Sequence, residues 1–171
     1  MAKSTSNLDF ASYEATRAGV AEDPDKGKGA FEAVTEWADG AIAVTRARSF
    51  EIKTDEPEAL GGKDSAIDPM ELVLGAIGSC LTIGWVTHAN KRGVDFRHLR
   101  ITVRAPFDLR GYLNVDDKVR PGFSAIEYEV EVDSDADAAT LEEIRTASEA
   151  GSPVVDNILN ATPLTGTVVR Q

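Results

Sequence analysis

The sequence predicts an α+β fold in which antiparallel sheets pack around one long helix. Residues 30–54 alternate apolar and polar positions on both sides of Asp39-Gly40, a dipeptide typical of hairpin turns. Residues 69–92 form one apolar segment behind Asp68-Pro69, which reads as a helix cap followed by a first-turn proline. Residues 124–135 alternate strictly, as a half-exposed antiparallel strand requires. The resulting order β-β-α-β-β-α-β separates hairpins from helices, which excludes a doubly wound parallel sheet.

The remaining elements follow along the chain. Residues 7–20 form a sparse amphipathic helix that ends at EDPDKGKG, so residues 1–28 are predicted to be an N-terminal helical extension and 29–171 the main domain. Strands are expected at 30–37 and 41–54, and then a loop at 55–68. A strand over 95–109 and a polar connection over 107–124 come after the long helix. Helices over 133–151 and 152–160 precede a closing strand over 162–170.

Composition limits the function. With 29 Asp and Glu against 18 Lys and Arg, the net charge of −11 repels phosphate backbones and anionic lipid, so nucleic acid and membrane surfaces are not expected partners. One cysteine cannot form an intramolecular disulfide, and MAKSTSNLDF has no apolar signal region, so a cytoplasmic location is expected. His88 and His98 lack ligand-like neighbours at suitable spacing, so neither a metal nor a cofactor is expected.

The long helix has two alternative readings. Residues 72–90 carry no formal charge, which approaches the length of a membrane span, but polar side chains interrupt the segment. Gly75, Gly78 and Gly84 would each cost about 1 kcal/mol in a helix unless a neighbour packs closely on them. A helix that is apolar on all sides must be covered on all sides, and a single domain of this size covers it poorly. We therefore expect a homodimer.

Cys80, the only cysteine, lies in this helix. A free cysteine in an apolar helix serves either chemistry or packing. Glu71 lies nine positions earlier, which places it about 13 Å away along the axis and on roughly the opposite face. The two side chains cannot meet within one straight helix. If both serve one pocket, that pocket combines Glu71 of one chain with Cys80 of another.

Three segments resemble the OsmC/Ohr family, the osmotically inducible protein C and organic hydroperoxide resistance proteins. DPMELVLGAIGSCL is similar to the family's segment ending in G-S-C, DEPEALGG resembles the segment before it, and DLRGYLNVDDKVRPGF resembles the DLRGF-type insertion of longer members. The resemblance implies an OsmC-like fold and an intertwined homodimer whose two sheets, shared by both chains, wrap the central helices. It also implies a thiol peroxidase site with Cys80 as peroxidatic cysteine and Glu71 as active-site glutamate.

The sequence departs from the family pattern at two places. Members with full activity carry a second cysteine before Pro-Val, where this chain has Ser152, and a hydroxyl cannot resolve a sulfenic acid into a disulfide. Cys80 also lies about three turns inside its helix, beyond the reach of the helix dipole, so a neighbouring cation is needed to stabilise its thiolate. The arginine of the family's first hairpin is missing. Arg46 and Arg48 on the next strand are the candidates for that cation, or they are solvent-facing strand residues.

Two functions follow. The first is a one-cysteine thiol-dependent peroxidase that reduces organic hydroperoxides with an external thiol as reductant. The rival is a non-catalytic dimer that binds a small hydrophobic ligand in the interfacial pocket. A hydrolase using Cys80 is a third, weaker alternative because no histidine is placed near it. Glu71 and Ser152 also have structural explanations. Glu71 could be a first-turn acid that complements the helix dipole, and Ser152 could be a helix N-cap.

Overall fold

The computed structural model describes residues 6–170, and within them the chain divides into two compact units. The first unit comprises residues 8–75, and the second comprises residues 76–170 together with residues 6 and 7. Each unit has its own antiparallel sheet, three-stranded in the first and two-stranded in the second. The predicted α+β class is confirmed. The predicted boundary at residues 28/29 stays a prediction.

The first unit begins with the expected N-terminal helix and continues into a sheet. Helix α1 spans Phe10–Glu22, and Asp9 caps it by accepting a hydrogen bond from Ser12 N at 3.0 Å. The short 3₁₀ turn η1 (Pro24–Gly27) follows. Strands β1 (Val34–Asp39), β2 (Ile42–Ala47) and β3 (Phe50–Thr54) then pair antiparallel in the order β1-β2-β3.

The turns of this sheet confirm one prediction and correct another. The hairpin at Asp39-Gly40 is present, with Gly40 at φ +54°. The single strand expected over 41–54 is wrong, because the chain reverses at Arg48 and forms a second hairpin, β2–β3. Arg48 takes a φ of 55°, in the left-handed region that a non-glycine residue seldom adopts. Arginine is not a residue that marks a turn in a sequence. The alternating pattern therefore predicted one strand where the structure has two.

The loop at 55–68 is organised around one buried carboxylate. Asp55 is 1 % exposed and accepts hydrogen bonds from the backbone of Glu56, Lys63 and Ser65 and from the Ser65 hydroxyl. The 3₁₀ turn η2 (Glu58–Leu60) lies inside the loop. Gly62 is required here, since a Cβ at this position would lie 1.8 Å from the Glu56 carbonyl oxygen.

The long helix α2 spans Pro69–Arg92, as predicted, and continues from the first unit into the second. Asp68 Oδ1 accepts from Met70 N at 2.6 Å, which confirms the predicted cap before Pro69. By length and composition this helix alone, among residues 6–170, would suffice to cross a bilayer, a test that the core helix of a soluble protein also passes. The absence of a membrane partner stays a prediction.

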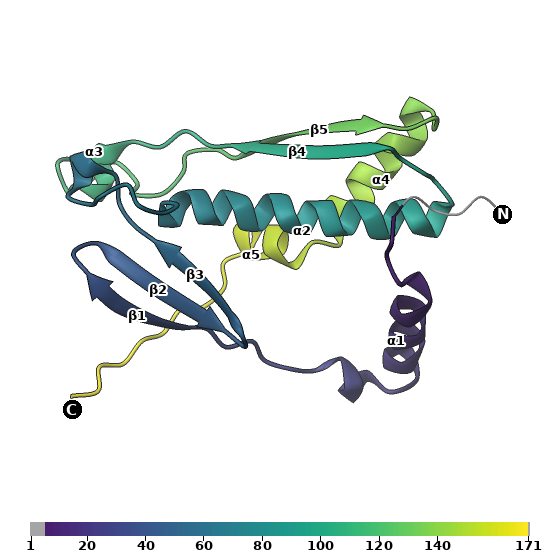
Figure 1. Cartoon of the computed structure of the whole chain (residues 1–171), viewed down its shortest axis with the longest axis horizontal. Helices are drawn as coiled ribbons and strands as arrows, with labels where there is room; N and C mark the ends of the chain where they lie inside the picture. The colour runs from purple at the N-terminus through teal and green to yellow at the C-terminus, as the bar shows by residue number, and fades with distance from the viewer. Residues whose placement is uncertain (1–5, 171) are drawn as a thin grey trace. The chain divides into compact units, whose positions relative to one another are not determined.

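The second unit packs strands and helices around the part of α2 from Ala76 onward. Strands β4 (His98–Arg104) and β5 (Glu127–Asp133) form an antiparallel ribbon that runs alongside α2 (Figure 1). The connection between them contains a short helix, α3 (Leu109–Tyr112). Helices α4 (Ala138–Ala150) and α5 (Pro153–Leu159) follow β5 and return the chain to α2.

Among residues 6–170, buried apolar side chains are few and all lie in this second unit. Trp85, Ala89 and Ile144 form one cluster, and Ile77 and Leu81 complete the fully buried set among the described residues. Partly buried side chains from β4, β5 and α4 pack on the cluster, as the alternating pattern of β5 predicts for one of its faces. These five buried residues are a small core for a chain of 171.

The closing strand predicted over 162–170 is wrong for the structure described. The residues after α5 are extended without a strand partner among residues 6–170, and Leu164, Val168 and Val169 are 84–98 % exposed. An extended segment becomes a strand only when another backbone satisfies its amide and carbonyl groups. The alternating pattern of this tail therefore indicates a capacity for pairing that the isolated chain does not use.

Candidate functional site

The structure brings together two of the predicted site residues, Cys80 and Ser152. The Ser152 Oγ lies 3.0 Å from the Cys80 Sγ, although 72 positions separate the two residues in sequence. Ser152 is 4 % exposed, whereas Cys80 is only partly buried. Cys80 as a residue is therefore partly open to solvent, whereas Ser152 is buried.

Hydrogen-bond roles at this pair are fixed by the start of α5. Ser152 is the N-cap of that helix, and its Oγ accepts from Val155 N at 3.2 Å, as the sequence predicted. Its single hydroxyl proton remains for Cys80, so the sulfur is the acceptor. A donor aimed at sulfur stabilises negative charge on it, which is what a nucleophilic thiolate needs.

A close contact between α2 and α4 places Ser152 at this position. A Cβ built on Gly84 would lie 3.2 Å from the Cβ of Ser148 and 3.3 Å from its Cα and carbonyl oxygen. Gly84 is one turn beyond Cys80 on α2, and Ser148 precedes Ser152 by four residues. The close packing predicted for the helix glycines is confirmed here. It is not found at Gly75, where a Cβ would meet nothing within 4 Å.

Glu71 has a structural role at the start of α2. Its Oε2 accepts from Asp68 N at 3.1 Å, while Asp68 caps the first turn in return. This reciprocal arrangement is a capping box, which satisfies backbone donors that the helix itself leaves free. The geometry supports the structural alternative for Glu71. A catalytic role for it stays a prediction.

Arg46 and Arg48, the candidate activating cations, have partners within their own sheet. Arg46 pairs with Glu36 at 2.6 Å and with Glu51 at 3.0 Å across β1–β2–β3. The Arg48 guanidinium lies 5.0 Å from the centroid of the Phe50 ring. Both are exposed, but only Arg46 lies on a strand, because Arg48 lies in the turn between β2 and β3. Their role toward Cys80 stays a prediction.

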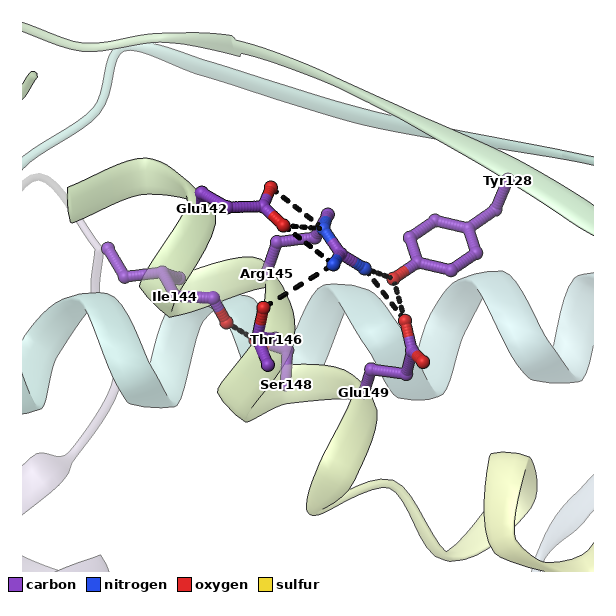
Figure 2. Close-up of polar contacts among 7 residues, drawn as sticks. All are labelled: Tyr128, Glu142, Ile144, Arg145, Thr146, Ser148 and Glu149. Atoms are coloured by element: carbon purple, nitrogen blue, oxygen red, sulfur yellow. Dashed lines mark hydrogen bonds and ion pairs between the residues drawn. The ribbon is translucent and has the colours of Figure 1, made fainter. Parts of the chain in front are cut away.

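A polar cluster that the sequence analysis missed lies next to the Cys80–Ser152 pair along the chain. Tyr128 on β5 donates its hydroxyl proton to Glu149 at 2.5 Å and accepts from Arg145 at 2.6 Å (Figure 2). Arg145 also binds Glu149 at 2.7 Å and, on its outer side, Glu142. The spacing of Arg145 and Glu149 by four positions on a predicted helix was a detectable signal, whereas the approach of Tyr128 was not.

Charge and burial within this cluster keep Tyr128 protonated. Burial, and then its hydrogen bond to the Glu149 carboxylate, raise the pKa of Tyr128 above its usual value. Hydrogen bonds to Glu142 and Tyr128 raise the pKa of Arg145 above its usual value. The hydroxyl is thus a donor and the guanidinium a cation throughout the physiological range.

Comparison with known proteins agrees with this architecture. The family model described as OsmC-like protein matches residues 62–166, more than half of the chain. The chain belongs to the OsmC-like protein family. The resemblance inferred from the GSC-containing segment is confirmed, and assignment to the longer DLRGF-type branch stays a prediction. No curated protein matched the sequence.

Solved structures of OsmC-like proteins share the fold of this chain. The OsmC-like protein from Mycoplasma pneumoniae has a TM-score of 0.68 and 12 % identity, covering 78 % of this chain and 90 % of that one. An organic hydroperoxide resistance protein OsmC from Legionella pneumophila has a TM-score of 0.56 and 13 % identity, covering 77 % and 91 %. An organic hydroperoxide resistance protein from Elizabethkingia anophelis has a TM-score of 0.56 and 12 % identity, covering 78 % and 91 %. At these identities the likeness establishes the OsmC-like fold.

Proposed function

We propose that this protein is a thiol-dependent peroxidase that reduces organic hydroperoxides through Cys80. The observation that supports this most is the hydrogen bond from the Ser152 hydroxyl to the sulfur of a cysteine that is only partly buried. A cysteine retained only for packing would be expected among apolar atoms, whereas this one has a buried polar donor. Family membership and the organic hydroperoxide resistance proteins among its structural neighbours agree with the substrate class.

The reaction begins when the Cys80 thiolate attacks the terminal oxygen of the hydroperoxide. An S–O bond forms, the O–O bond breaks, and the alkoxide leaves as the alcohol after taking up a proton. The sulfur is oxidised to a sulfenic acid and the peroxide is reduced by two electrons. In this scheme the Ser152 hydroxyl donates a hydrogen bond to the sulfur before the attack and to the sulfenic acid after it.

An external thiol completes the cycle, because residue 152 supplies a hydroxyl and the chain has one cysteine. The first thiol displaces water from the sulfenic acid and forms a mixed disulfide with Cys80. A second thiol then releases Cys80 and leaves as the disulfide of the two reductants. A cytoplasmic location would supply such thiols.

A homodimer is the proposed assembly. The described residues contain few buried apolar side chains, while large apolar side chains remain exposed in both units, including Trp37 and Phe50 of the first sheet and Leu164 of the tail. Surface of this kind marks an interface in a soluble protein. In the dimer, Glu71 of one chain would approach Cys80 of the other, and Arg46 or Arg48 would be the nearby cation. Sedimentation velocity that gives the mass of one chain at micromolar concentration would contradict this assembly.

The rival function is binding of a small hydrophobic ligand without redox turnover, and Ser152 in place of a resolving cysteine is the feature that favours it. A coupled assay with cumene hydroperoxide and dithiothreitol separates the two. The peroxidase predicts turnover above the rate of dithiothreitol alone and its loss in Cys80→Ser. Equal rates for the wild type and Cys80→Ser would reject the peroxidase and leave the binding protein.

A further inference from the structure

The contact between Ser152 and Cys80 depends on where α4 ends. Ser152 N donates to the Glu149 carbonyl oxygen at 3.1 Å, and Gly151 N donates to the Ala147 carbonyl oxygen at 3.1 Å. The turn that carries Ser152 is therefore built directly on the last residues of α4. A displacement of Glu149 would move the Ser152 hydroxyl as well.

Glu149 is held from outside α4 by the β5 side chain Tyr128. Tyr128 OH lies 2.5 Å from Glu149 Oε2, and Arg145 bridges the same two groups from one helical turn earlier (Figure 2). The three groups form a closed set in which the Tyr128 hydroxyl, one Arg145 nitrogen and one Glu149 oxygen are each hydrogen-bonded to the other two. The Arg145 guanidinium also lies 5.9 Å from the centroid of the Tyr128 ring, within the range of a cation–π contact.

The same helical turn is fixed on its other side by α2. Ser148 is 3 % exposed, donates to the Ile144 carbonyl oxygen at 2.6 Å and packs against Gly84. The end of α4 is thus clamped between α2 and β5, with Ser148 facing one and Glu149 the other. Removing either contact leaves the turn at Ser152 held from one side only.

We propose that Tyr128, with Arg145 and Glu149, is a positioning residue for the reactive sulfur: it holds the end of α4 so that the Ser152 hydroxyl reaches Cys80. This inference rests on the proposed role of Cys80 as the reactive sulfur. Tyr128 touches neither sulfur nor substrate in this scheme. It acts through the backbone between Glu149 and Ser152.

A double-mutant cycle tests this route. The measurement is the rate of Cys80 alkylation by iodoacetamide as a function of pH for wild type, Tyr128→Phe, Ser152→Ala and the double variant. Tyr128→Phe is expected to lower the rate at pH 7 by about threefold and to move the profile to higher pH, since a weakened donor stabilises the thiolate less. In the Ser152→Ala background, Tyr128→Phe should add no further change, because its effect passes through the missing hydroxyl.

Two matched variants separate positioning from general loss of stability. Glu142→Gln removes the exposed carboxylate from the same Arg145 and should leave the alkylation profile as in wild type. Ser134→Ala removes a hydroxyl that donates to the Asp95 carbonyl oxygen and accepts from Ala136 N, at the opposite end of α4 from Ser152. It should lower stability without moving the profile. Should Tyr128→Phe fail to fold, Glu149→Leu carries the same prediction, since it removes both bonds with a good helix former.

An unchanged profile in a folded Tyr128→Phe variant would overturn the proposal, as would an equal shift in the presence and absence of the Ser152 hydroxyl. Alkylation requires no peroxide. The positioning role therefore survives or fails separately from the peroxidase activity. If the protein shows no peroxidase turnover but the alkylation profiles still follow the double-mutant cycle, the proposed function is rejected and the positioning role is retained.

Discussion

Gly84 of α2 and Ser148 of α4 approach so closely that a methyl group on Gly84 would lie 3.2–3.3 Å from three atoms of Ser148, two of them backbone atoms. Gly84→Ala should gain about 1 kcal/mol in helix propensity. It should lose more through the displacement of α4, since overpacking of this kind costs about 1–3 kcal/mol. We expect a net loss of stability, measured by urea unfolding, and slower alkylation of Cys80.

Gly75→Ala on the same helix is the control for Gly84→Ala. A Cβ at position 75 meets nothing within 4 Å, so the gain in helix propensity should appear undiminished as about 0.5–1 kcal/mol of added stability. Equal effects of the two substitutions would show that the contact between α2 and α4 is looser than described.

Ser152→Cys should create a redox pair with Cys80. The Oγ of residue 152 already lies 3.0 Å from the sulfur, so a thiol there needs to move by only about 1 Å to form a disulfide bond. After treatment with one equivalent of cumene hydroperoxide, the variant should lose both free thiols. Each chain should lose about 2 Da, the mass of two hydrogen atoms, and the oligomeric state should not change. Retention of one free thiol per chain, with Cys80 as the sulfenic acid, would contradict the geometry.

Asp55 should make the first unit sensitive to acid. Hydrogen bonds from the Ser65 hydroxyl and from three backbone amides lower the pKa of Asp55 from 3.8 to about 2. Because the folded-state pKa lies below the unfolded one, its contribution to stability is complete above about pH 4 and is lost as pH falls toward 2. Asp55→Asn should therefore destabilise the protein strongly at pH 7 and much less near pH 2.

Asp64→Asn is the matched control in the same loop. Asp64 is exposed, so the control should unfold like wild type at each pH tested by urea titration. A constant difference between wild type and Asp55→Asn from pH 7 to pH 2.5 would contradict the assigned role of the carboxylate.

Local sequence signals identified the elements that carry the site. Asp68-Pro69 located the start of α2, and Ser152-Pro153 located the cap of α5. Both signals work because capping depends on side chains next to the helix end. The strict alternation of residues 124–135 likewise found β5, since a half-buried antiparallel strand has a period of two.

Local sequence signals could not predict contacts between residues that are distant in sequence. The approach of Ser152 to Cys80 was expected only through the resemblance to a family, and the attachment of Tyr128 to Glu149 was not expected at all. The hairpin at Arg48 was missed because its left-handed backbone has no glycine to mark it. The opposite error occurred at residues 162–170, where a strand was predicted from the pattern but the described chain offers no partner strand.

The most direct test of the central claim is the second-order rate at which cumene hydroperoxide oxidises Cys80 in a single turnover at pH 7. Stopped-flow quenching with a sulfenic acid trap would measure it for the wild type and for Ser152→Ala. We predict a wild-type rate at least about a hundredfold above that of free cysteine and a drop of about tenfold in Ser152→Ala, which equals about 1.4 kcal/mol of lost transition-state stabilisation. A wild-type rate equal to that of free cysteine would contradict the account.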